Sequence, residues 1–117
     1  MSTWDETVFS EDDNVAFLDE LAALDDADCV QAVRDAVTLA AQGDVSSPEE
    51  ENNGYAAATI VAIWAGAPFS AGKTVEEYPF IRDLSGSGDE ELNEKAAELL
   101  EEVDEDYDLD SFLEALA

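Results

Sequence analysis

The feature that most constrains the fold is an apolar segment, residues 55–68, in the middle of a very acidic chain. Residues 46–88 carry six acidic and two basic side chains, whereas residues 1–45 carry twelve and one, and residues 89–117 carry thirteen and one. Charged side chains are almost never fully buried unless they are paired. We therefore predict a buried central element with acidic segments packed around it.

The sequence Ser47-Pro48-Glu49-Glu50 marks the start of this central element. It combines a serine that can cap a helix, a proline at the first helical position and a glutamate at the third. The predicted helix continues to Gly66, and its second half is apolar on nearly every side. Such a helix is typical of the centre of a core.

Apolar residues at helical spacing recur on both sides of this segment. They predict a helix opened by Ser10 and Asp13, a second one capped by Asp26 or Asp28, a third opened by Ser87, and a short last helix after an acidic turn. No alternating strand pattern is present. We predict a single acidic helical domain over 1–117, an all-α compact bundle of four to five helices with an extended N-terminal arm and a long irregular loop at about 66–88.

The first nine residues lack a helical pattern, yet they hold two large aromatic side chains, Trp4 and Phe9. Aromatic rings in a short arm usually pack against a core, since each buries a large apolar area. We expect Trp4 and Phe9 to anchor the arm on the helices. The alternative is an arm that binds a partner.

The chain holds 31 Asp and Glu against four Lys and Arg, with no His, for a formal net charge of −27. This charge argues against binding of nucleic acid, because phosphates would be repelled. The start has no pattern of a signal peptide, and the apolar run is too short to span a membrane. We expect a soluble, cytoplasmic protein whose acidity serves solubility, attracts a basic protein partner, or imitates nucleic acid.

Aspartates alternate near the C-terminal end as they do in calcium-binding loops. A complete loop starting at Asp104 needs Gly at its sixth position and Glu at its twelfth. This chain has Leu109 and Ala115 there, so the sharp turn and the bidentate ligand are missing. Weak divalent-metal binding at Asp104, Asp106 and Asp108 is the metal site that the sequence predicts.

No motif predicts a cofactor or a catalytic centre. Residues 67–74 fit a relaxed phosphate-loop pattern ending in Lys73-Thr74, but a predicted helix precedes them and Pro68 removes a backbone amide. Without histidine, the commonest general base is missing. The single Cys29 excludes an internal disulfide, and its apolar neighbours favour a buried side chain. We predict no cofactor and no enzymatic activity.

The N-terminal segment carries a recognisable set of residues, as does the alanine-rich segment 55–62. The N-terminal set is Trp4, Phe9, Asp12, Asp13, Phe17 and Leu18. Together they resemble the bacterial family called domain of unknown function 4259, which usually has glycine where this chain has Ser2, Asp5 and Thr7. The resemblance implies a small soluble bacterial protein, and it supplies no activity and no catalytic residue.

The function expected from these observations is a non-enzymatic domain that binds another protein, with a basic protein as the partner. One alternative is an immunity or inhibitor protein, or a DNA mimic, directed against a basic nuclease or DNA-binding protein. The other is a hydrolase that uses carboxylates and a divalent metal. A binding domain would retain a basic partner in a salt-sensitive way, whereas a metallohydrolase would couple saturable metal binding to turnover.

Overall fold

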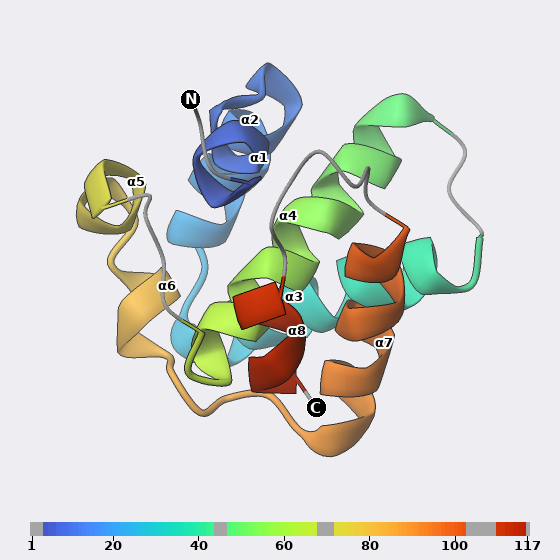
Figure 1. Cartoon of the computed structure of the whole chain (residues 1–117). Coiled ribbons are helices and arrows are strands. Elements are labelled where there is room, and N and C mark those ends of the chain that lie inside the picture. The colour runs from blue at the N-terminus through green and yellow to red at the C-terminus, as the bar shows by residue number, and fades with distance from the viewer. Residues whose placement is uncertain (1–3, 44–46, 68–71, 103–109, 117) are drawn as a thin grey trace.

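The computed structural model describes residues 4–43, 47–67, 72–102 and 110–116, and every regular element within these ranges is a helix (Figure 1). The predicted all-α fold class is therefore confirmed. The helices are α1 (Trp4–Ser10), α2 (Asp12–Ala22), α3 (Asp26–Ala41), α4 (Pro48–Trp64), α5 (Gly72–Glu77), α6 (Phe80–Asp83), α7 (Glu90–Glu101) and α8 (Asp110–Leu116).

Helix α4 lies at the centre of the molecule, as the apolar middle segment predicts. It packs most extensively against α3 and α7, and α1, α2, α6 and α8 also contact it (Figure 1). Every residue from Ala56 to Trp64 is buried. The acidic residues of α4 are confined to its first turn, where the positive end of the helix dipole favours carboxylates. The core therefore needs no charged group inside it.

Short polar side chains cap the three longest helices, α3, α4 and α7. The Oγ of Ser47 accepts a hydrogen bond from the Glu50 backbone N–H at 3.3 Å, as predicted, and Pro48 is the first residue of α4. Asp25 caps α3, and Asp89 caps α7. The predicted caps Asp26 or Asp28 and Ser87 are thus wrong by one to three residues, because a nearby aspartate takes the extended cap conformation.

The extended N-terminal arm is wrong over Trp4–Ser10, which forms helix α1. Ser10 ends α1 and does not cap α2, because its hydroxyl donates to the Thr7 carbonyl at 2.9 Å. A helix satisfies its own backbone groups, which allows this segment to lie against the core. Phe9 is only 2% exposed and belongs to the hydrophobic core. The Trp4 side chain lies outside the described residues.

A buried asparagine holds α1 and α2 together. Asn14 is fully buried, and its Nδ2 donates to the Val8 carbonyl at 2.7 Å. This bond joins the end of α1 to the first turn of α2. Buried polar groups are costly unless they are hydrogen-bonded, so the contact favours one packing angle between the two helices.

The predicted irregular loop at about 66–88 contains two short helices, α5 and α6. Ile81 is fully buried and holds this segment against the core, as its apolar character predicts. At the other end, the Gly86 N–H donates to the Trp64 carbonyl at 2.9 Å. Gly86 has a φ of 86°, a left-handed conformation that other residues rarely adopt. The turn therefore ties the approach to α7 onto the C-terminal end of α4.

Tyr78, between α5 and α6, links this segment to α2. Its hydroxyl donates a hydrogen bond to the Asp19 carboxylate at 2.5 Å. This bond, together with burial and the negative charge of Asp19, raises the pKa of Tyr78 from 10.0 to about 12. A raised pKa means that the folded state favours the protonated phenol.

We expect the Tyr78 contact to stabilise the fold below pH 10 and to lose its effect as the pH rises toward about 12. Between these values the unfolded state releases the phenolic proton first, so unfolding becomes easier with increasing pH. Urea denaturation at about pH 9 and pH 11 measures this loss. Tyr78→Phe should lose less stability over the same interval, and an identical loss in both proteins would contradict the assignment.

Candidate acidic binding groove

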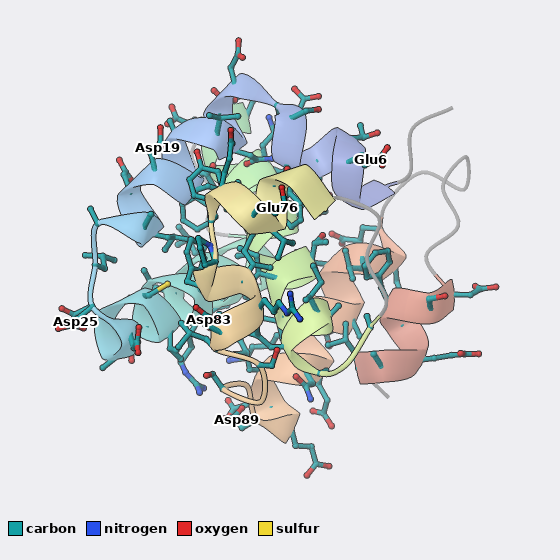
Figure 2. The ribbon with its side chains drawn as sticks, turned by 90° about the vertical axis from the view of Figure 1, so that its left-hand side faces the viewer. Glu6, Asp19, Asp25, Glu76, Asp83 and Asp89 are labelled. Atoms are coloured by element: carbon teal, nitrogen blue, oxygen red, sulfur yellow. The ribbon has the colours of Figure 1, made fainter. Side chains whose placement is uncertain are left out.

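Exposed carboxylates are found on many sides of the molecule. With 31 acidic and four basic side chains, acidic groups outnumber basic groups by 27 (31 minus 4). Two pairs that do form join Arg34 to Asp89 at 2.8 Å and Lys95 to Glu91 at 3.3 Å. Figure 2 shows exposed carboxylates on many sides of the ribbon, among them Glu6, Asp19, Asp25, Glu76, Asp83 and Asp89.

We expect this repulsion to make the stability salt-dependent. Exposed charges repel each other over about 30 Å at 0.01 M salt but only over about 8 Å at 0.15 M. Because folding brings the carboxylates together, added salt relieves the folded state more than the unfolded state. The melting temperature should therefore rise by at least about 5 °C between these concentrations, which corresponds to roughly 1 kcal/mol. A flat or falling melting temperature would show that the charges are locally neutralised.

One part of this surface is hollowed into a groove between α7 and α8. Its volume is about 720 Å³. Ala97 of α7 and two leucines of α8, Leu113 and Leu116, give it an apolar floor. Its acidic wall consists of Asp89, Glu90, Glu94, Glu98 and Glu101. We call this feature the α7–α8 groove.

The amphipathic pattern of α7 positions the acidic wall. Leu92, Ala96 and Leu99 are buried on the inner face of the helix. The four glutamates follow one another at intervals of four, four and three residues, so they share the opposite face. At 1.5 Å per residue, the row from Glu90 to Glu101 extends over about 16 Å.

Asp89, the first residue of the acidic wall, also caps α7. One of its carboxylate oxygens accepts from the Leu92 N–H at 2.8 Å, and the other pairs with Arg34 of α3. The bond to Arg34 is the main cause that holds the pKa of Asp89 below its ordinary value, and the Leu92 N–H adds to it. Asp89 is therefore ionised at neutral pH and partnered within the chain.

Unlike Asp89, the four glutamates of the wall are not members of the ion pairs described above. None of the residues that line the groove is basic, and the ion pair of Lys95 goes to Glu91, which lies outside the lining. Asn93 also lines the groove, and its Oδ1 is buried without a hydrogen-bond partner. The groove thus combines negative charge and an apolar floor along one elongated surface.

Comparison with known proteins places the chain in a family. Residues 2–115 match the family described as Domain of unknown function (DUF4259). The chain belongs to the DUF4259 family. The match extends the resemblance of the N-terminal and alanine-rich segments over nearly the whole chain. No curated protein and no solved structure matches it significantly. Membership of DUF4259 assigns no activity, so a function has to be argued from the surface itself.

The metal site predicted for this DUF4259 domain at Asp104, Asp106 and Asp108 lies outside the described residues. Among the residues that are described, no group of three or more His, Cys, Asp or Glu is arranged to hold a metal ion. Lys73 lies in α5, and its side chain is likewise outside the description. Over the described ranges, none of the helices has the length and apolar character needed to cross a membrane.

Cys29 is buried, as its neighbours predict, and is only 1% exposed. Burial, with a smaller contribution from Asp26, raises the pKa of its thiol to about 11. The thiolate is the nucleophilic form of cysteine. Cys29 of the DUF4259 domain is therefore an inert part of the core at neutral pH.

The sequence pattern predicts the apolar side of α7 and the short last helix, but it does not by itself predict the α7–α8 groove of this domain. The usable signal was the recurrence of glutamate at 90, 94, 98 and 101. The apolar floor could not be predicted, because the packing of α8 against α4 and α7 depends on contacts distant in sequence.

Proposed function

We propose that this DUF4259 domain is a cytoplasmic, non-enzymatic protein-binding domain whose partner is a basic protein. The observation that carries the proposal is the α7–α8 groove, where a row of glutamates borders apolar side chains and none of the lining residues is basic. Protein interfaces generally combine an apolar centre with a polar rim. Opposite charges on the two partners would also speed their association.

The chemistry available in the chain supports binding over catalysis. The sequence contains no histidine to act as a general base. Its one cysteine, Cys29, is buried with a raised pKa, so it does not supply an activated nucleophile. The glutamates of the groove lie on an exposed face of α7, whereas substrate sites are usually concave and enclose most of the ligand.

A second candidate is the inhibition of a basic nucleic-acid-binding protein by imitation of its ligand. Its support is the charge density of the domain. The longest extent of the molecule is 34 Å, and duplex DNA of that length carries about 20 charges at one per 1.7 Å. The net charge of −27 exceeds this number. A surface of this kind can compete for a site that normally holds phosphates.

Affinity capture with the immobilised domain tests the proposal. A basic protein should be retained from lysate at low salt, be released at high salt, and bind the purified domain saturably with one-to-one stoichiometry. If the partner is a nucleic-acid-binding protein, duplex DNA should compete with the domain for it. The proposal is contradicted if only salt-insensitive or acidic partners are retained, or if a divalent metal binds saturably and supports turnover.

A further inference from the structure

We infer that the α7–α8 groove receives a basic helical segment of the partner, which presents lysine or arginine side chains at intervals of one helical turn. The inference rests on the proposed function and specifies where on the domain the partner binds and in what form. It starts from the shape of the groove. The groove has a volume of about 720 Å³ and is bordered along α7 by the glutamates from Glu90 to Glu101.

The packing distance between helices decides what the groove can hold. Packed helices keep their axes about 8–10 Å apart, so a partner helix that lies on α7 and α8 inserts only the side chains of one face between them. The groove accordingly accommodates one row of side chains, while the backbone of the partner helix stays outside. An interface of this kind selects the partner by the residues along one face of its helix.

The acidic wall and the apolar floor together select lysine or arginine for that row. The long side chains of these residues bury their methylene groups against apolar surface and keep the charged end in a polar environment. In the groove, the methylene groups would contact Ala97, Leu113 and Leu116, and the cationic ends would reach the glutamates. A purely apolar segment would leave the carboxylates desolvated, and a segment with short polar side chains would not cover the leucines.

The spacing of the glutamates favours a helical partner. Glu90, Glu94 and Glu98 follow each other at about 6 Å along the axis of α7, as residues four apart do on any α-helix. A partner helix with basic residues at the same intervals, lying along α7, places each cationic end beside one carboxylate. The pairing of opposite charges along two neighbouring helices is the means by which coiled-coil helices select partners.

A synthetic peptide provides the probe. It is an alanine-rich helix of about 18 residues, long enough to form in water, with lysines at i, i+4, i+8 and i+11. The control peptide has the same composition, but its lysines are distributed around the helix. Binding is followed by fluorescence anisotropy at about 0.05 M and 0.15 M salt. The structure predicts tighter, saturable binding of the peptide with the single row of lysines.

Two protein variants of equal charge locate the binding site. Glu94→Gln with Glu98→Gln removes two carboxylates from the groove. Glu6→Gln with Glu20→Gln removes two exposed carboxylates from α1 and α2, away from the groove lining. An exposed ion pair changes affinity by up to roughly fivefold, so the groove variant should bind the peptide about tenfold more weakly. The control variant should change the affinity less than threefold, in proportion to its lost charge.

Circular dichroism and thermal melting of both variants establish that they remain folded. Equal losses of affinity in both variants, or equal binding of the two peptides, would overturn the inference. In that case the proposed function would stand, because a basic partner would still bind the acidic surface without using the groove. Failure of the proposed function is recognised separately, when affinity capture yields no basic protein at all.

Discussion

Replacing Phe9 with alanine is expected to lower the free energy of unfolding by about 3–5 kcal/mol. The side chain is 2% exposed and belongs to the main hydrophobic core. Helix α1 is only seven residues long, too short to be stable without packing. Removal of the ring leaves a cavity and also weakens the packing of α1 against α4. Urea denaturation followed by circular dichroism measures the effect.

Val15→Ala is the matched control for Phe9→Ala. Val15 lies in the neighbouring helix α2 but is 38% exposed, so its truncation should change the stability by less than about 0.5 kcal/mol. A loss of similar size for Phe9→Ala would show that α1 contributes little to the core. That result would favour the alternative interpretation, in which the N-terminal segment is an arm that binds a partner.

Replacing Gly54 with alanine is expected to destabilise the fold, although alanine is the better helix former. A Cβ atom at Gly54 would lie 2.4 Å from the Cβ of Ala40, at the crossing of α4 with α3. Overpacking of this kind costs about 1–3 kcal/mol, against a gain of up to about 1 kcal/mol in helix propensity. The expected net loss is about 1–2 kcal/mol, measured by urea denaturation.

Two further variants test the cause of this loss. Gly72→Ala, at the first position of α5, meets nothing within 4 Å and should leave the stability unchanged or slightly raised. Ala40→Gly removes the atom that a new side chain at Gly54 would meet. In a double-mutant cycle, Ala40→Gly should therefore cost less in the Gly54→Ala background than in the natural protein. Additive effects would show that the helix crossing does not cause the loss.

The sequence predicts the centre of this fold better than its ends. Ser47 and Pro48 form a start signal that depends only on neighbouring residues, and the apolar segment after them leaves a buried helix as the consistent outcome. Both features could therefore be interpreted locally, and the structure confirms α4 at the centre. The same local reasoning identified the apolar side of α7.

The errors arise where the outcome depends on tertiary packing. From its neighbours in sequence, Ser10 could either end one helix or cap the next. In the structure it ends α1, and its hydroxyl donates to the Thr7 carbonyl. The buried hydrogen bond from Asn14 to Val8 favours this arrangement. The α1 segment shows no helical pattern of its own and depends on its contacts with α4. The α7–α8 groove requires the position of α8, which no periodicity in the sequence specifies.

The further inference requires that a basic partner binds at the α7–α8 groove and not over the acidic surface in general. Titration of the isotopically labelled domain with the lysine-row peptide, followed by amide chemical shifts in NMR spectra, tests it most directly. We predict that the largest shift changes at about 0.15 M salt fall within Glu90–Glu101 and Asp110–Leu116. Changes of similar size spread over α1, α2 and α3 would contradict the claim.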